Sequence, residues 1–234
     1  MGATIWGREL VEFGRRRRAL AIKLAYPLVV GLPILFGGAP RFYAAMVLTM
    51  LVATLPALGT GAVLARERAT GMQRRYRLLP RPAGALLVER LAASALIDAI
   101  QFLPVLALVA LRSPDGWRWW GPVALCTAGV LAIGNAVGAL ASSLTSAPGE
   151  VMLYVLIPLL PAFYLAGLFV PPRGNIAVLV SRLLPFSYLH DGLVGALGGS
   201  PVLDPTRVAV AGVAMVAAGA LAAAAIGRRV LETG

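Results

Sequence analysis

Long apolar stretches, separated by charged residues, make up most of this chain. The gaps between charges define six of them: residues 24–40, 42–65, 91–111, 119–149, 151–172 and 208–227. A helix needs about 20 mainly apolar residues to cross the hydrocarbon core of a bilayer. The stretches approach or exceed that length, and only Asp98 interrupts the third. The pattern predicts an all-α, polytopic membrane protein with six transmembrane helices, in which residues 1–234 form a single transmembrane domain.

Residues 173–207 are too apolar for an ordinary loop between two of these spans. They contain the stretches NIAVLVSRLL and HDGLVGAL, and each is too short to cross a bilayer. We therefore predict short re-entrant helices that enter the outer leaflet and return before the last span. In the fifth span, Pro158 and Pro161 each remove a backbone donor, which predicts a kink or a break.

The first residues form a separate amphipathic pattern. Over residues 3–18, Trp6, Leu10 and Phe13 recur at helical spacing on one face. The opposite face is charged, with Arg8, Glu12 and Arg15. This predicts an interfacial helix lying on the membrane surface. An ordinary helix that is anchored by its arginines is an equal alternative.

Composition and charge support a membrane class and give it an orientation. The chain is 59% hydrophobic and 13% charged, whereas a soluble domain is about a quarter charged, so a soluble enzyme is excluded. Of the basic residues, 15 fall on the side of the two termini and only six on the other side. The excess of positive charge faces the cytoplasm. Both termini are therefore expected in the cytoplasm, with the chain in the inner (plasma) membrane, and the charge of +11 needs no nucleic-acid partner.

The segment 66–82, RERATGMQRRYRLLPRP, carries six arginines and one glutamate. It is long for a connection between two neighbouring helices. Helix-forming residues fill its first half, Pro80 and Pro82 act as stops, and residues 83–90 restart a helix. We interpret it as a cytoplasmic helical elbow with a docking surface for a partner. Anchoring by positive charge alone is the alternative.

No set of residues in the sequence suggests catalysis or a metal site. Ser187, His190 and Asp191 are neighbours in sequence, and sequence neighbours seldom form a catalytic relay. The only lysine, Lys23, is followed by Leu24, so there is no phosphate-binding GK[ST] loop. We expect no ATP hydrolysis by this chain, and no cofactor or metal of its own.

Two groups inside the spans invite a specific interpretation. Asp98 is the one acid within a predicted span, with Gln101 three residues later and Asn135 available from the fourth span. Such an acid is costly in a membrane and marks either a functional residue or a hydrogen-bonded structural one. Gly134 and Gly138 allow helices to approach closely, either within the chain or between two copies.

Two segments resemble those of ABC-2 type permeases. Residues 65–90 are similar to the family's ERE-x-G-T-x-x-x-L-x-x-x-P segment through Glu67, Arg68 and Gly71. Residues 183–197 look like its NPLTY-x-x-D-x-x-R segment. The matching positions in this second segment are Pro185, Tyr188 and Asp191. The chain departs from these patterns at Ala69, Met72, Leu184 and Gly195.

The resemblance implies the membrane half of an ABC exporter of the drug-resistance type. A separate ATP-binding subunit would bind ATP and Mg, and a second permease copy or a paralogue would complete the pathway in the lipid bilayer. Residues 3–18 would be the connecting helix. The coupling helix that contacts the ATPase subunit would include Arg66, Glu67, Arg68, Gly71, Met72, Arg74, Arg75, Tyr76 and Arg77.

The translocation path is expected to carry a drug or a lipid-like molecule, with Pro185, Tyr188 and Asp191 in the segment that caps its outer end. The path residues we expect are Asp98, Gln101, Asn135, Tyr154 and Tyr164. One alternative is a secondary transporter coupled to protons through Asp98. No inverted repeat relates the two halves of the sequence, which disfavours that alternative. A membrane-embedded enzyme is disfavoured by the absence of a catalytic set.

Overall fold

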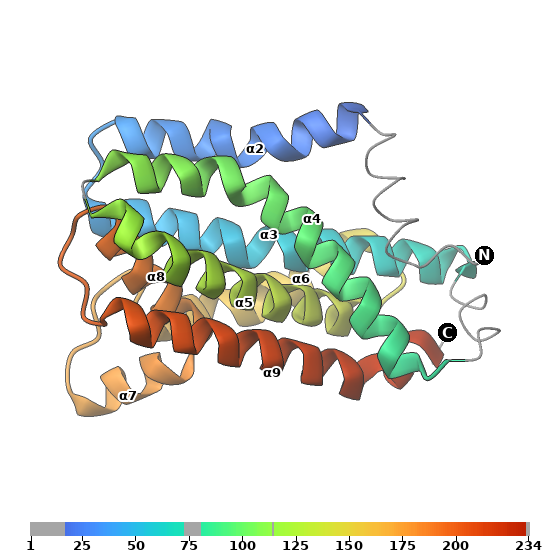
Figure 1. Cartoon of the computed structure of the whole chain (residues 1–234). Coiled ribbons are helices and arrows are strands. Elements are labelled where there is room, and N and C mark those ends of the chain that lie inside the picture. Colours follow the sequence, from blue (N-terminus) through green and yellow to red (C-terminus); the bar gives the residue numbers. More distant parts are fainter. Residues whose placement is uncertain (1–16, 73–80, 114, 233–234) are drawn as a thin grey trace.

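The structure is a computed structural model that describes residues 17–72, 81–113 and 115–232. Within these ranges it is helical and contains no strand. The helices are α2 (Arg17–Phe36), α3 (Arg41–Ala69), α4 (Ala83–Arg112), α5 (Gly116–Ser142), α6 (Pro148–Leu165), α7 (Asn175–Leu183), α8 (Pro185–Ala196) and α9 (Pro205–Glu232). The long helices run back and forth along one axis (Figure 1). The predicted all-α class is confirmed.

Five helices, α3, α4, α5, α6 and α9, are long and apolar enough to cross a membrane. The apolar part of α2, Ala21–Phe36, is shorter. The chain is therefore a multi-pass membrane protein with five spans of full length among its described residues, while a sixth span through α2 stays a prediction. The predicted interfacial helix over residues 3–18 lies almost wholly outside the described residues.

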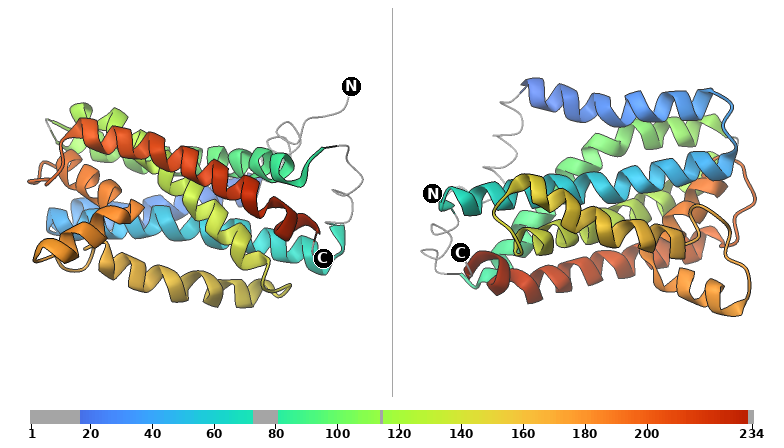
Figure 2. Two further views of the ribbon diagram at one scale, coloured as in Figure 1. Left: turned by 90° about the horizontal axis from the view of Figure 1, so that it is seen from below. Right: turned by 180° about the vertical axis from the view of Figure 1, so that it is seen from behind.

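Helix α5 lies at the centre and packs against α9, α3, α4 and α8 (Figures 1 and 2). Glycines make these contacts possible. A Cβ added to Gly138 would lie 2.1 Å from the carbonyl oxygen of Ala57 in α3, and one at Gly212 in α9 would lie 2.6 Å from the backbone of Leu125 in α5. The small residues predicted from the sequence thus pack helices within one chain.

Helix α6 lies at the margin of the bundle (Figure 2), where it packs mainly on α3. It continues through Pro158 and Pro161, so the predicted break does not occur. The helix ends at Leu165 rather than near residue 172, because Gly167 adopts a left-handed turn with φ 79°.

Two short helices, α7 and α8, occupy the region in which re-entrant helices were predicted. They are separated at Leu184, and Pro185 begins α8, a position where its missing N–H costs nothing. Both lie at the end of the bundle opposite to the ends of α3 and α9 (Figure 1). Their existence agrees with the sequence, and their re-entry into a membrane stays a prediction.

Candidate functional site

The end of α3 forms the base of the predicted docking segment. The helix stops because Thr70 caps it, donating its backbone N–H to the Arg66 carbonyl at 3.0 Å, and Gly71 then turns left-handed with φ 68°. Only glycine adopts this conformation without strain. The glycine that matches the ABC-2 segment therefore ends the helix and directs the chain away from it.

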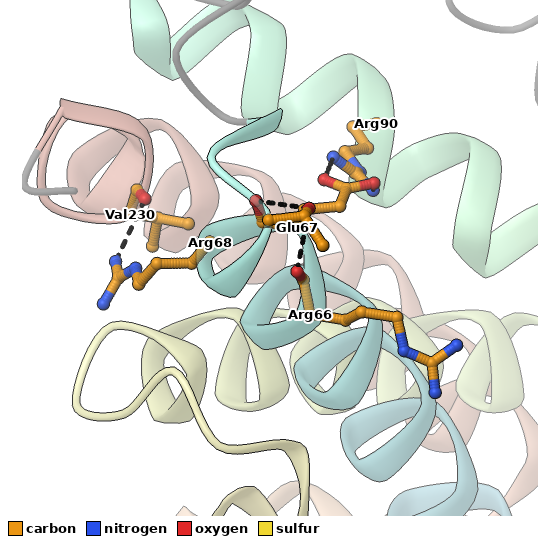
Figure 3. Close-up of polar contacts among 6 residues, drawn as sticks. Arg66, Glu67, Arg68, Arg90 and Val230 are labelled. Atoms are coloured by element: carbon orange, nitrogen blue, oxygen red, sulfur yellow. Dashed lines mark hydrogen bonds and ion pairs between the residues drawn. The ribbon is translucent and has the colours of Figure 1, made fainter.

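Glu67, one turn earlier, points into the bundle and meets Arg90 of α4 (Figure 3). The Arg90 atoms Nη1 and Nη2 donate to Oε2 and Oε1 of Glu67, each at 2.5 Å. Arg90 is only 5% exposed. A bidentate arginine–carboxylate pair fixes orientation as well as distance, so it holds the end of α3 against the first half of α4.

The two arginines beside Glu67 differ in direction. The Nη2 atom of Arg68 donates to the Val230 carbonyl at 3.2 Å, in the last turn of α9, while Arg66 is exposed and points away from this cluster (Figure 3). An arginine satisfies an otherwise unpaired carbonyl at the C-terminal end of a helix well. Arg68 therefore ties α9 to the same place.

The predicted docking residues thus do not form one exposed surface among the described residues. Glu67 and Arg68 make contacts inside the chain, whereas Arg66 is exposed. Gly71 and Met72 are partly exposed after the helix end. The others, Arg74, Arg75, Tyr76 and Arg77, lie outside the described residues. The contact with Arg90 was not expected from the sequence, although an arginine that interrupts the apolar start of α4 was a signal.

A second polar cluster lies deeper in the bundle, around Asp98. The Asn135 Nδ2 donates to Asp98 Oδ2 at 3.2 Å and to the Leu131 carbonyl at 2.9 Å, and Thr60 Oγ1 donates to Asn135 Oδ1. All three side chains are buried. They join α4, α5 and α3, which is how buried polar groups avoid the cost of lost hydration.

The peripheral helix α2 also reaches this cluster. Lys23 Nζ lies 4.0 Å from Asp98 Oδ1, with the lysine side chain 47% exposed. The structure therefore brings Asp98 and Asn135 together, as the sequence suggested, and adds Thr60 and Lys23, which the sequence analysis had not connected with them. Gln101 is buried on the same helix as Asp98.

The two tyrosines predicted for the path lie elsewhere. Tyr154 and Tyr164 are 43% and 65% exposed on α6, at the margin of the bundle. They do not share a surface with the buried Asp98 cluster. The five predicted path residues therefore belong to two places, one inside the chain and one on its outer face.

At the opposite end, the residues that match the second ABC-2 segment also make contacts within the chain. Arg182 Nη1 donates to Asp191 Oδ2 at 2.9 Å, and the Tyr188 hydroxyl donates to the Arg182 carbonyl at 2.9 Å. The guanidinium of Arg182 also lies 5.9 Å from the centre of the Tyr188 ring. Together with Pro185 at the start of α8, these contacts hold α7 against α8.

The side chains of Ser187, His190 and Asp191 each have a different partner. Ser187 donates to the Leu184 carbonyl at 3.0 Å, and Asp191 pairs with Arg182. Burial lowers the pKa of His190 from its ordinary value. Its Nε2–H donates to the Phe42 carbonyl at 3.2 Å, and the imidazole fastens α8 to α3.

A helical bundle with five spans of full length and charged clusters near its ends defines a polytopic membrane protein. The chain belongs to the family described as ABC-2 family transporter protein, whose model matches residues 36–227. This confirms the resemblance read from the sequence and makes the chain a membrane permease component of an ABC transporter. Such a component works with an ATP-binding subunit and normally has no ATPase activity itself. A comparison with curated proteins gives no match.

Proposed function

We propose that this chain is the membrane subunit of an ABC exporter that moves a hydrophobic or amphipathic substrate, a drug or a lipid-like molecule, and that a separate ATPase subunit drives it. The observation that carries the proposal is the family match over residues 36–227, together with an arginine-rich sequence between α3 and α4, two helices that Glu67 and Arg90 hold together. A permease needs such an attachment because its energy source lies outside the membrane.

The ATPase subunit docks on the segment that follows α3. Arg66 is exposed at its start, and Arg74, Arg75 and Arg77 add positive charge further along. Glu67 and Arg68 support this surface from inside the chain rather than forming part of it. The same end carries Arg228 and Arg229, so the positive-inside rule assigns it to the cytoplasm. The α7–α8 end then faces outward from the inner membrane.

The substrate path forms between this chain and a second permease copy or paralogue. A path between two chains must be lined by residues that a single chain leaves exposed. Tyr154 and Tyr164 meet this requirement on α6, where the outer face is otherwise apolar. Asp98, Gln101 and Asn135 are buried, so their role is to hold helices in place beside the path.

A second candidate function rests on the same buried acid. A carboxyl group at membrane depth is expensive and often carries protons, and Asp98 is 8% exposed among three helices. Under this alternative the chain would be a proton-coupled secondary transporter. The contact of Asp98 with Lys23, and the hydrogen bond that Asp98 accepts from Asn135, instead favour a structural role for Asp98.

The test is an affinity purification of the full chain from its native membrane in mild detergent, followed by mass spectrometry. We expect a stoichiometric ATPase subunit that is lost when Arg74, Arg75 and Arg77 are changed to Glu. The matched control changes three exposed arginines of the opposite end to Glu, namely Arg118, Arg173 and Arg207. Absence of any ATPase from the wild-type preparation would overturn the proposal, and loss in the control alone would relocate the docking site.

A further inference from the structure

The ion pair of Glu67 and Arg90 closes the base of the docking segment. The two residues lie 23 positions apart in sequence, one near the end of α3 and the other near the start of α4. The chain between them contains most of the predicted docking segment, residues 66–82, and the first turns of α4. Whatever binds this segment therefore acts on two helices that are fastened together where the segment joins them.

The geometry of the pair makes this joint stiff. Both contacts are 2.5 Å long and parallel, and the side chains of Arg90 and Glu67 are 6% and 16% exposed. If the helices were to separate here, each buried charge would lose its partner, which is strongly unfavourable. The end of α3 and the start of α4 therefore move as one body, and Arg68 adds the last turn of α9 to it.

The same two helices are also connected further into the bundle, where Asn135 of α5 lies between them. Asp98 follows Arg90 by eight residues on α4, a rise of about 12 Å, and Thr60 precedes Glu67 by seven residues on α3. Both spacings are close to two helical turns, so each pair shares one face. Helices α3 and α4 are thus connected twice, directly by Glu67–Arg90 and indirectly through Asn135 of α5, which bonds to both Asp98 and Thr60.

We propose that Glu67 and Arg90 are positioning residues that transmit the movement of the docked ATPase subunit to α4. From α4 the movement passes through the bond between Asp98 and Asn135 to α5, and through the bond between Asn135 and Thr60 to α3. This inference rests on the proposed function. It assigns the acid of the ABC-2 segment to transmission rather than to docking. Removing the pair leaves the ATPase bound and active but disconnects its movement from the far end of the bundle.

A neighbouring ion pair provides a matched control. Glu89 Oε2 accepts from Arg81 Nη1 at 3.0 Å, one residue before Arg90 on the same helix, and Arg81 is largely exposed. This pair joins α4 only to the residues just before it. Glu89→Gln removes one carboxylate from the same end of the same helix without touching the α3–α4 joint.

The experiment uses the complete complex in lipid nanodiscs, with an environment-sensitive dye at Val202→Cys. Val202 is 77% exposed between α8 and α9, at the far end of the bundle, and Cys126 is fully buried and so does not take up dye. The chain is labelled before the ATPase subunit is added. A second label position, Leu183→Cys at the end of α7, reports on the same end.

We expect ATP to change the dye signal in the wild type and in Glu89→Gln. In Glu67→Gln the ATPase subunit should still be bound and should still hydrolyse ATP, while the signal change is lost. Arg90→Lys keeps the positive charge but loses the two-point contact of the guanidinium with Glu67, so it should retain part of the change in dye signal. It also replaces Glu67→Gln in the comparison if that variant does not fold.

Four results would overturn the inference. Release of the ATPase by Glu67→Gln would make Glu67 a docking residue and leave the proposed function intact. If Glu67→Gln lowered the melting temperature but kept the normal change in dye signal, the pair would only stabilise the fold. An ATP-hydrolysing wild type with no change at either label would show that nothing is transmitted to this end. A wild type that binds no ATPase would remove the proposed function as well.

Discussion

At each end of the bundle an ion pair joins two helices, but the two pairs differ in burial and in geometry. At each end an acid from a segment that resembles ABC-2 permeases pairs with an arginine of a neighbouring helix, Glu67 with Arg90 and Asp191 with Arg182. The first pair is a buried fork between two long helices. The second is a single contact at 2.9 Å between two short helices, with the arginine side chain 23% exposed.

This difference indicates what each end has to withstand. Under the proposed function, a subunit driven by ATP would act on the end of α3 and the start of α4, and a joint that fixes distance and orientation suits that end. The α7–α8 end needs only to keep its two short helices in place: Tyr188 joins α8 to α7, and His190 joins α8 to α3. In both cases the characteristic residues act inside the chain, where partners were not expected from the sequence.

The largest effect is expected from Arg90→Ala. It leaves the Glu67 carboxylate mostly buried without its partner, and breaking a buried pair in this way costs about 3 kcal/mol of the free energy of unfolding. Denaturant unfolding in detergent measures the loss. A loss equal to that of Asp191→Asn at the α7–α8 end, described below, would show that the two ion pairs do not differ in strength.

The packing between the ends should be the next most sensitive. In Gly138→Ala the new methyl group meets the Ala57 carbonyl, so α3 and α5 must move apart, at a cost of about 2 kcal/mol. The matched control is Gly121→Ala in the same helix, where a Cβ meets nothing within 4 Å. The same unfolding measurement should show no loss there. Equal losses in both variants would contradict the packing argument, because alanine has the higher helix propensity and a Cβ at Gly121 meets no neighbour.

A smaller effect is expected from Asp191→Asn at the α7–α8 end. The amide keeps the shape of the side chain and loses the charge that Arg182 meets, which costs about 1 kcal/mol for a partly exposed pair. The ATPase subunit should copurify as with the wild type. Loss of that subunit would show that the two ends are not mechanically distinct.

The smallest effect is expected from Asp98→Asn. The new side chain still accepts from Asn135 and loses only the charge that faces a half-exposed Lys23, so the change in unfolding free energy stays below about 1 kcal/mol. The ATPase rate of the complex and its dye response at Val202→Cys should be retained. If this variant abolished transport, the proton-coupled alternative would be favoured. Asp98, which lies between the two ends, would then be the residue on which transport depends.

Much of the fold could be predicted because each helix is encoded locally. Apolar runs predicted the spans, and the restart of a helix at residue 83 coincides with the first residue of α4. The resemblance found the family. The predicted break in α6 was wrong, because a helix whose neighbours are apolar has no better place for its backbone groups than the helix itself. The kink stays a prediction.

The site was less predictable, because its contacts depend on how helices cross. Asn135 was expected near Asp98 from the order of the spans, and the structure has them hydrogen-bonded. Nothing in the sequence distinguished Arg66, which is exposed, from Glu67 and Arg68, which turn inward. The three side chains point in different directions because consecutive residues are rotated around the axis of α3.

The sequence by itself determined that this protein lives in a membrane, roughly where its helices run and which of its ends carries the positive charge, because hydrophobicity and charge are properties of each segment alone. Only the tertiary structure decided that Glu67 meets Arg90, that Asp98 reaches Asn135, and that the glycines of α5 serve packing within the chain. Such contacts join residues far apart in sequence, and they exist only once the helices have packed in one arrangement.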